Sequence, residues 1–385
     1  MLFESYETFV RLTLALLGYG FIRWLLPEKF VWHRFGLLIV NAAVLLTFIG
    51  EHTLIVLSLL SLIVYAAGKA ANNKVVRAVM WLVIGLFVLR NYEAFSGLLP
   101  RLQGPLFSVE RIGLSYIVFR MVHWLIESNK GKIQASDVLT FLNYIFFFPT
   151  FLAGPIDTYS NFHQGANHRP RRIEVAWIPY GLGRVLLGAT KTLLLVPLVR
   201  PWGLDWHSVG AETGLSAGLA FPLSLVAYSA YILFDFSGYS DIAIGIGRWM
   251  GFRLPENFRN PYFASSLSDF WRRWHISFSN FLRRYVFMPT IRILNSSNVL
   301  MRRPVLVTIL SYLFTFLLCG FWHGDALHFG VWGLWHGIGL AIAKLWRDYL
   351  RPSWAKGVAY DMTTTVLTFS FVTAGWYWFH YPIIF

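Results

Sequence analysis

Residues Ser268–Ser277 read SDFWRRWHIS, a stretch too polar for lipid that stands between apolar runs long enough for a membrane. Ionisable residues at membrane depth are energetically costly and usually mark a functional site. Two further polar motifs belong with this stretch: Phe234–Asp241 (FDFSGYSD) upstream and Gly320–Gly324 (GFWHG) downstream, where a histidine ends a nearly uncharged span. The sequence therefore predicts a membrane protein organised around the polar motifs between residues 228 and 336.

The composition is typical of a polytopic membrane protein. Of the 385 residues, 56% are hydrophobic and 14% are charged, whereas soluble domains carry about 25% charged residues. The net charge of +14 comes from short basic clusters between apolar runs, a pattern that indicates positive-inside topology rather than a face for nucleic acid. We therefore expect membrane lipids as partners and no nucleic acid. The single cysteine, Cys319, excludes an intramolecular disulfide.

Apolar segments predict about ten membrane crossings, because each is long enough to cross about 30 Å of hydrocarbon. They lie near 8–26, 35–50, 52–68, 78–97, 110–127, 177–199, 215–234, 304–322, 329–346 and 360–381. The first segment lacks a basic start and a small-residue cleavage site, so we expect it to remain as an anchor. The basic loops at 69–77 and 130–132 fall on the same side if the N-terminus is outside. This count places both termini outside the cytoplasm.

Residues 138–160 are apolar, but they do not read as a straight crossing. Pro149, Gly154 and Pro155 stand where a helix would have to continue. A re-entrant hairpin is the better interpretation, and non-helical backbone at depth must be buried in protein or line a wet cavity. By the same reasoning, we expect the polar residues of Phe234–Asp241 to interrupt the apolar stretch before them.

The central stretch predicts an amphipathic helix at the cytoplasmic interface, from Ser268 as N-cap to about Phe287, with Pro289 as its stop. At 100° per residue, one aromatic face is shared or bordered by Trp271, Arg272, Trp274, His275, Phe278, Leu282 and Arg283. Two interpretations remain open. The arginines bind lipid phosphate, or their guanidinium groups hold the phosphates of an anionic acyl donor. His275 is either catalytic or pins a buried loop, and the positioning role is favoured.

His323 also has two interpretations. A neutral imidazole can take a proton from a hydroxyl at physiological pH, as acyl transfer to an alcohol requires. Alternatively, His323 is an interfacial histidine beside Asp325 and His328. Neither His328 nor His336 lies at helical ligand spacing from His323, and no His-Glu-x-x-His motif is present, so no metal site is expected. Cys319, one turn before His323, is interpreted as a packing residue.

Five motifs in order resemble those of the membrane-bound O-acyltransferase family, over roughly residues 105–345. They are Phe148–Thr150 (FPT), Gly154–Asp157 (GPID), Pro255–Phe258 (PENF), Phe270–His275 (FWRRWH) and Gly320–Gly324 (GFWHG). The resemblance implies an all-α fold in which a ring of membrane helices, with re-entrant and interfacial helices, surrounds a central tunnel. It implies that His323 is the family's invariant histidine and His275 its second conserved histidine.

The motifs are divided between two branches of this family. The hairpin ending in GPID is similar to the branch that D-alanylates teichoic acid, whereas 234–241 and 271–277 are similar to the branch that O-acetylates alginate and cellulose. The resemblance implies a bacterial inner-membrane enzyme that moves a small acyl group, expected to be acetyl, from a cytoplasmic thioester to an extracytoplasmic polysaccharide. D-alanyl transfer to a teichoic-acid-like polymer is the alternative.

This interpretation gives each candidate residue a role. His323 is the general base, and His275 is the second candidate catalytic residue. The residues expected to bind donor or substrate are Asp235, Asp241, Asn257, Trp271, Arg272, Trp274 and Arg283. The donor is acetyl-CoA or an acyl carrier protein, no cofactor is expected to be bound, and the expected partner outside the membrane is an esterase-like acyltransferase of the SGNH type.

The last residues, Trp378–Phe385 (WFHYPIIF), have an ordinary and a specific interpretation. An aromatic belt at the end of the final span explains them. They also resemble the Phe-x-Tyr-x-x-Phe tail of the small membrane peptide of the D-alanylation branch, with Pro382 and one extra residue as departures. The resemblance implies that Tyr381 carries the acyl group as a phenyl ester, after folding back to His323. A phenol with pKa near 10 forms an ester that a serine nucleophile can accept.

Two other classes of protein remain open. A transporter or flippase of an anionic lipid or glycan would use the same basic face and broken helices without chemistry. A structural subunit of a secretion complex would use the arginine-rich helix as a docking surface. In each case we expect one membrane domain, with N-terminal helices (1–104), a motif-bearing core (105–345) and a final helix with its tail (346–385).

Overall fold

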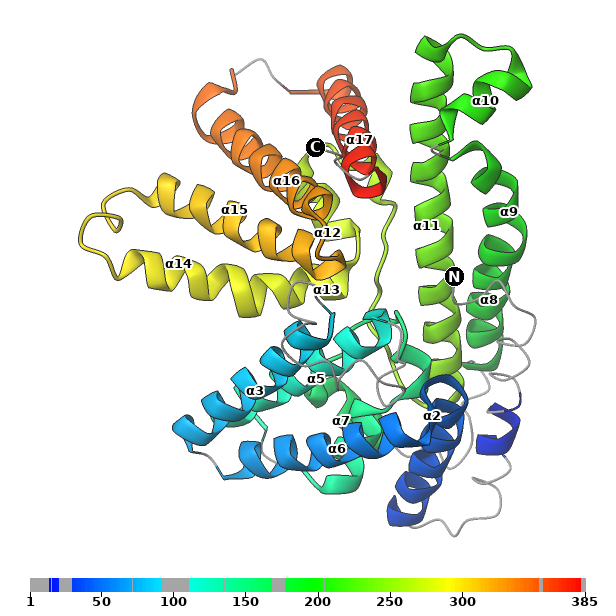
Figure 1. Cartoon of the computed structure of the whole chain (residues 1–385), viewed down its shortest axis with the longest axis vertical. Coiled ribbons are helices and arrows are strands. Elements are labelled where there is room, and N and C mark those ends of the chain that lie inside the picture. Colours follow the sequence, from blue (N-terminus) through cyan, green and yellow to red (C-terminus); the bar gives the residue numbers. More distant parts are fainter. Residues whose placement is uncertain are drawn as a thin grey trace. The chain divides into compact units, whose positions relative to one another are not determined.

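The computed structural model describes residues 14, 16–20, 30–70, 72–91, 111–133, 136–167, 177–203, 205–352 and 356–381. These residues form helices and turns and no β-strand (Figure 1), so the predicted all-α class is confirmed for this part of the chain. Two compact units are present. The first comprises Met1–Leu193 and Gly238–Pro255, and the second comprises Leu194–Ser237 and Glu256–Phe385.

The first unit is built from long helices around a broken segment. Its helices are α2 (Phe30–Lys69), α3 (Asn73–Asn91), α5 (Arg111–Asn129), α6 (Val138–Ile145), α7 (Tyr159–Asn167), α8 (Trp177–Thr190) and the C-terminal part of α11 (Ala217–Trp249). Helix α2 packs against α5 and α6, and α3 packs against α5 (Figure 1).

Helix α2 contains two of the predicted crossings, 35–50 and 52–68. Gly50 separates them with φ 71° and ψ 166°, a conformation that glycine adopts without steric cost. A straight helix of 40 residues would be about 60 Å long, roughly twice the hydrocarbon thickness. The bend at Gly50 is therefore what allows both halves to lie within one bilayer.

The predicted break in 138–160 is present. Helix α6 ends at Ile145, and a 3₁₀ turn at Phe148–Thr150 is followed by irregular chain. The side chain of Arg120, only 1% exposed, donates hydrogen bonds to the carbonyl oxygens of Tyr144 at 3.3 Å, Ile145 at 2.7 Å and Thr150 at 2.7 Å. The end of a helix leaves such carbonyls without a helical partner. One buried guanidinium therefore satisfies the backbone where the helix stops.

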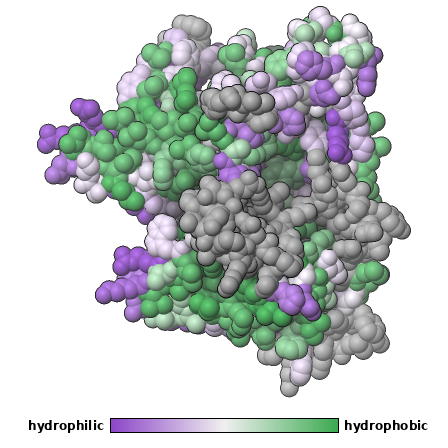
Figure 2. All heavy atoms as spheres, viewed as in Figure 1, coloured by the Kyte–Doolittle hydropathy of each residue, from purple (hydrophilic) through white to green (hydrophobic). Residues whose placement is uncertain are grey.

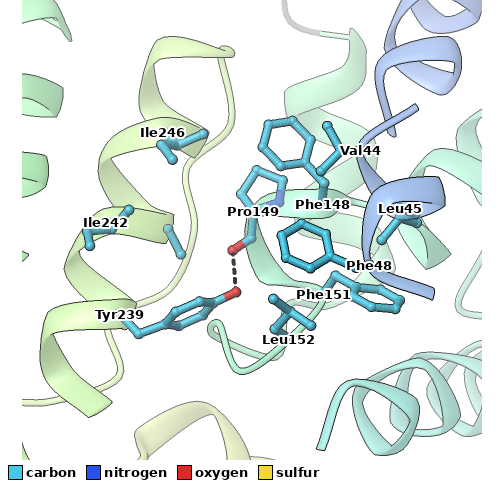
Figure 3. A pocket seen from close by; sticks show the side chains of 11 residues that line it. Val44, Leu45, Phe48, Phe148, Pro149, Phe151, Leu152, Tyr239, Ile242 and Ile246 are labelled. Carbon is cyan, nitrogen blue, oxygen red and sulfur yellow. Dashed lines mark hydrogen bonds between the residues drawn. The ribbon is translucent and has the colours of Figure 1, made fainter. Parts of the chain in front are cut away.

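An apolar pocket adjoins this break. Figure 3 shows Phe148, Pro149, Phe151 and Leu152 of the broken segment facing side chains of α2 and α11. The hydroxyl of Tyr239 on α11 donates to the carbonyl oxygen of Pro149 at 3.2 Å. The side chain of Asn41 on α2 accepts from the amide of Phe148 at 3.0 Å. The break is therefore held by side chains of three helices, α2, α5 and α11.

The expected interruption at Phe234–Asp241 is wrong. Helix α11 runs without a break from Ala217 to Trp249. Asp241 does not break it, because its carboxylate forms ion pairs with Arg184 and Lys191, each at 2.6 Å. Paired in this way, a carboxylate can be buried inside an apolar protein.

Gly238, which was expected to help break the helix, instead brings helices together. A Cβ added at Gly238 would lie 3.1 Å from the carbonyl oxygen of Gly188 on α8, and one added at Gly188 would lie 2.5 Å from that of Gly238. The two glycines therefore set the close approach of α8 to α11. Small residues at helix interfaces have this role in membranes.

The second unit carries the remaining helices. They are α9 (Val196–Val199), α10 (Trp206–Thr213), the first part of α11, α12 (Leu267–Arg273), α13 (Ile276–Leu282), α14 (Met288–Asn295), α15 (Pro304–His323), α16 (Leu327–Leu345) and α17 (Val358–His380). Helix α15 packs against α14 and α16, and α16 packs against α17 (Figure 1). The face of α14–α16 seen in Figure 2 is largely hydrophobic, and hydrophilic residues gather at the turn between α14 and α15.

The prediction of one helix over 268–287 is wrong. The chain forms two short helices, α12 and α13, separated at His275, which adopts the left-handed conformation with φ 42° and ψ 54°. The N-cap is Ser266, whose hydroxyl oxygen accepts from the amide of Asp269 at 3.2 Å, and not Ser268. The aromatic face inferred from a continuous helix therefore does not exist as such.

Pro289 does not stop the helix either. A π-helical turn at Arg283–Phe287 follows α13, and Pro289 lies in the first turn of α14. The π-helical turn before it changes the backbone pairing from i→i+4 to i→i+5, and this local change accommodates a residue without an N–H. The chain therefore continues as helix to Asn295.

Four helical stretches in the described ranges are long and apolar enough to cross a membrane: Trp32–Lys69, Trp177–Trp202, Ala217–Trp249 and Pro304–His323. The expected crossing at 8–26 and parts of those at 78–97 and 110–127 fall largely or partly outside the described residues. The number of ten crossings and the central tunnel stay predictions.

We expect Arg120→Met to lower the free energy of unfolding by about 3 kcal/mol, because an unsatisfied buried acceptor costs about 1–3 kcal/mol and several lose their donor. Reversible unfolding in detergent measures the difference. The control is Arg77→Met, since the exposed Arg77 donates only to Asn73 in its own helix. Equal stability of the two variants would show that Arg120 does not hold the break.

Candidate active site

His275 lies at the break between α12 and α13 and is 4% exposed. Its Nδ1 is 3.1 Å from Oδ1 of Asn257. The same oxygen accepts from the amide of Ser277 at 3.2 Å and from its hydroxyl at 2.8 Å. Because the Ser277 amide can only donate, this Asn257 atom must be the oxygen, and His275 Nδ1 must carry the proton. The lone pair of the neutral ring is therefore on Nε2.

Backbone hydrogen bonds join the PENF motif to the same break. The amide of Ile276 donates to the carbonyl oxygen of Asn257 at 2.9 Å, and the amide of Arg259 donates to that of Arg273 at 2.9 Å. A left-handed conformation costs a non-glycine residue about 1–2 kcal/mol, and such residues cluster at functional sites. His275 therefore shapes the chain as well as presenting its ring.

His323 is the last residue of α15. Its ring is partly exposed, and the described residues form no hydrogen bond with it. Aromatic rings surround it: Trp332 at 5.1 Å and Phe379 at 5.0 Å between centroids, both edge to face, and the adjacent Trp322 at 4.5 Å. The imidazole nitrogens are therefore available to a hydroxyl group in a largely apolar setting.

The two glycines of the GFWHG motif explain how α16 comes close to His323. A Cβ added at Gly320 would lie 2.1 Å from the carbonyl oxygen of Phe329, and one added at Gly324 would lie 2.3 Å from the Phe329 ring. Gly333 on α16 makes a matching approach, because a Cβ added there would lie 2.1 Å from the carbonyl oxygen of Phe316. Sequence reasoning missed this role, although two glycines four residues apart are a known signal of close helix packing.

His275 and His323 belong to one aromatic cluster in the second unit. Phe278 lies 4.9 Å from the His275 ring and 4.5 Å from Trp322, the neighbour of His323. Burial lowers the pKa of His275 well below its usual value, and the nearby His323 lowers it further. His275 is therefore neutral near pH 7. The structure thus brings together the two histidines that the sequence singled out.

The other predicted binding residues are distributed unequally. Trp271, Trp274 and Asn257 are buried in the second unit, and Asp235 is half-buried there. Arg272 and Arg283 are exposed.

Two charged candidates have protein partners. Arg272 forms an ion pair with Asp269 at 3.3 Å, of a surface kind that contributes at most about 1 kcal/mol. Asp241 belongs to the first unit and is held by Arg184 and Lys191. No group of three or more His, Cys, Asp or Glu side chains in the described ranges could hold a metal ion.

Tyr381 follows the last turn of α17. Its ring packs against Tyr377 at 4.9 Å and His380 at 5.0 Å, whereas Phe379 contacts His323. Residues 382–385 lie outside the described part of the chain. The expected fold-back of Tyr381 onto His323 stays a prediction.

Apolar helices of membrane-spanning length and a histidine pair in an aromatic cluster define a membrane protein with a candidate acid–base site. The profile of the family described as "MBOAT, membrane-bound O-acyltransferase family" matches residues 53–381. The chain belongs to this family, so the resemblance inferred from the five motifs is confirmed, and over more of the chain than residues 105–345.

Several characterised proteins of this family are similar to the chain. The "Probable alginate O-acetylase AlgI" of Pseudomonas fluorescens is 31% identical over 310 residues, which cover 80% of this chain and 58% of that protein. The teichoic acid D-alanyltransferase of Streptococcus thermophilus is 29% identical over 71% of this chain and 70% of its own length. The peptidoglycan O-acetyltransferase of Helicobacter pylori is 33% identical over 66% of this chain and 46% of its own length. The chain thus spans about half to three fifths of the O-acetylating relatives.

We expect Gly320→Ala to destabilise the protein by about 1–3 kcal/mol, the usual range for overpacking, because its methyl group would collide with backbone at Phe329. Thermal unfolding in detergent measures the effect. The matched control is Gly183→Ala in α8, where nothing lies within 4 Å of the added Cβ. Alanine should be neutral or stabilising by up to about 1 kcal/mol there. Similar unfolding temperatures for the two variants would contradict the close packing of α15 and α16.

Proposed function

We propose that this protein is an O-acyltransferase of the bacterial inner membrane that moves a small acyl group, acetyl, from a cytoplasmic thioester to an extracytoplasmic polysaccharide. The observation that carries the proposal is His323, a partly exposed imidazole at the end of an apolar helix with no hydrogen bond to the described residues. Family membership supports the reaction class. The names of the relatives, which refer to alginate, teichoic acid and peptidoglycan, support a polymer of the cell envelope or a secreted polymer as acceptor.

In this proposal His323 acts as general base. The acceptor hydroxyl donates to an imidazole nitrogen of His323, and its oxygen attacks the thioester carbonyl carbon while the ring takes the proton. The tetrahedral intermediate then breaks its C–S bond, and the proton passes from the imidazolium to the leaving thiolate. The surrounding rings exclude water, which would otherwise hydrolyse the thioester.

His275 has a positioning role in the same proposal. Its Nδ1–H is committed to Asn257, and its neutral ring lies in the cluster that contains His323. A second cation beside His323 would oppose protonation of the base. A neutral His275 therefore keeps His323 able to accept a proton during attack.

The exposed guanidinium groups of Arg272 and Arg283 would bind the phosphates of the donor, either coenzyme A or the phosphopantetheine arm of an acyl carrier protein. Arginine suits this role because its planar fork matches phosphate oxygens.

With both termini outside, the acyl group would pass to an esterase-like partner that acylates the glycan. D-alanyl transfer is the second candidate, because the D-alanyltransferase of S. thermophilus aligns over 70% of its length.

We expect His323→Ala to reduce acylation by about 10²–10⁴-fold, the contribution of a general base, while protein level and membrane insertion persist. The measurement is the ester content of the purified envelope polymer. The control is His52→Ala, because His52 is exposed, with 69% of its side-chain surface accessible. Normal ester content in the His323→Ala strain would exclude the base assignment and favour a transporter.

A second prediction concerns the proposed acyl-tyrosine. We expect Tyr381→Phe, which keeps the ring and removes the hydroxyl, to abolish polymer acylation, because no phenol oxygen is left to carry the acyl group. Mass spectrometry of the C-terminal peptide should show an acyl ester on Tyr381 in the unmodified protein. Tyr377→Phe, which removes the hydroxyl of the ring packed against Tyr381, should retain activity. Full acylation by the Tyr381→Phe variant would exclude the acyl-tyrosine and favour the interpretation of the tail as part of an aromatic belt.

A further inference from the structure

His336 in α16 is a second buried histidine that the proposed chemistry does not use. It is 1% exposed, and neither Nδ1 nor Nε2 has a hydrogen-bonding partner within the described residues. The indole Nε1 atoms of Trp271 and Trp332 are also buried without a partner there. Most buried polar atoms in native proteins are hydrogen-bonded, so a group of unpaired ones requires an explanation.

These three side chains lie together. The His336 ring is 5.2 Å from Trp271 and 4.9 Å from Trp332, measured between centroids, and the two indoles are 6.2 Å apart. They come from α12 and α16, which pack against each other. Each of the three side chains therefore has one N–H donor without a partner. The other ring nitrogen of neutral His336 is an acceptor.

Purely structural packing does not explain this arrangement. Each unpaired buried polar group costs about 1–3 kcal/mol, and an apolar ring at position 336 would fill the same core without that cost. The neighbouring Trp335 is paired, because its Nε1 donates to the carbonyl oxygen of Phe371 at 3.1 Å. The unpaired donors therefore indicate a guest that accepts hydrogen bonds.

Helix α17 approaches Nε2 of His336 at a glycine. Gly375 on α17 faces this atom, and a Cβ added there would lie 3.2 Å from Nε2 and 3.1 Å from the Trp335 ring. Any larger residue would cover the nitrogen. The other rings around His336 are those of Phe270, Phe316 and Phe371, so the ring contacts of His336 offer no charge to balance an ionic guest. A neutral oxygen fits this setting best.

The site adjoins the proposed general base. Trp332 contacts both histidines, with its ring 5.1 Å from His323 on one side and 4.9 Å from His336 on the other. A carbonyl group bound by these N–H donors would therefore lie close to a hydroxyl group bound by His323. Hydrogen-bond donors in a water-excluding site are also what stabilises a developing oxyanion.

We propose that Trp271, Trp332 and His336 bind the carbonyl oxygen of the acyl thioester and stabilise the negative charge that forms on it during attack. This inference rests on the proposed acyltransferase function and assigns the donor-side subsite of the same reaction. His336 donates one N–H and is not the base. Removal of one such donor typically lowers kcat by about 10²–10³-fold.

The test observes the indole N–H groups directly. The full-length protein in detergent is labelled with ¹⁵N-tryptophan and titrated with S-acetyl-N-acetylcysteamine, a minimal thioester, or with S-ethyl-N-acetylcysteamine, which lacks the carbonyl. We expect downfield shifts of the Trp271 and Trp332 indole protons with the thioester only. The Trp335 signal, already hydrogen-bonded, serves as internal reference. Trp271→Phe and Trp332→Phe assign the two signals.

Binding in this experiment does not depend on turnover. The shifts should persist in the His323→Ala variant, so the failure of the base assignment and the failure of this site are distinguishable. Gly375→Ala should abolish the shifts, because its methyl group would press against Nε2 of His336. Equal shifts with thioester and thioether, or no shift with either in the unmodified protein, would overturn the proposal and leave these nitrogens with bound water.

A kinetic test separates the two histidines. His336→Phe keeps an aromatic ring and should lower kcat by about 10²-fold with a smaller change in KM, whereas Trp335→Phe should leave both within about twofold of the parent. If His336→Phe and Trp335→Phe had equal kinetics, His336 would have no part in the reaction.

Discussion

The amide oxygen of Asn257 is the acceptor on which the site depends. It receives hydrogen bonds from His275 and Ser277, and so it joins the PENF segment to the break between α12 and α13. In an apolar interior water does not accept hydrogen bonds from these donors, and a buried donor without an acceptor lowers the stability of the fold. The left-handed turn at His275 brings these donors to one acceptor, and it determines where the imidazole points.

The sequence allowed the all-α class and the family to be predicted, because hydrophobic runs and short motifs are local signals. It also singled out His275 and His323, which lie in one aromatic cluster. The broken segment after α6 was also predictable, since proline and glycine act on the adjacent backbone. The predictions that failed concerned partners distant in sequence. Asp241 looks disruptive in isolation, but Arg184 and Lys191, 57 and 50 residues earlier, neutralise it inside a continuous helix. Likewise, the left-handed residue at 275 depends on Asn257 and not on the local pattern.

Buried polar groups divide into two kinds in this protein. Arg120 donates to the carbonyl oxygens at the end of α6 and after it, and its role is therefore structural. Trp271, Trp332 and His336 have donors without a partner among the residues that the structure describes. The sequence does not distinguish paired from unpaired buried polar groups, because each appears as a polar residue within an apolar run. Only the presence or absence of an acceptor in three dimensions separates a structural group from a candidate binding group.

The contact between α15 and α16 also restricts how this chain can diverge. Gly320 and Gly333 each face a backbone carbonyl of the opposite helix at a distance that admits no Cβ. A second substitution can shorten a side chain that is in the way, but it cannot remove a backbone carbonyl. Replacement of either glycine therefore requires α15 and α16 to move apart, and α16 carries Trp332 and His336. At these two positions the constraint on substitution therefore comes from the backbone of the neighbouring helix and not from its side chains.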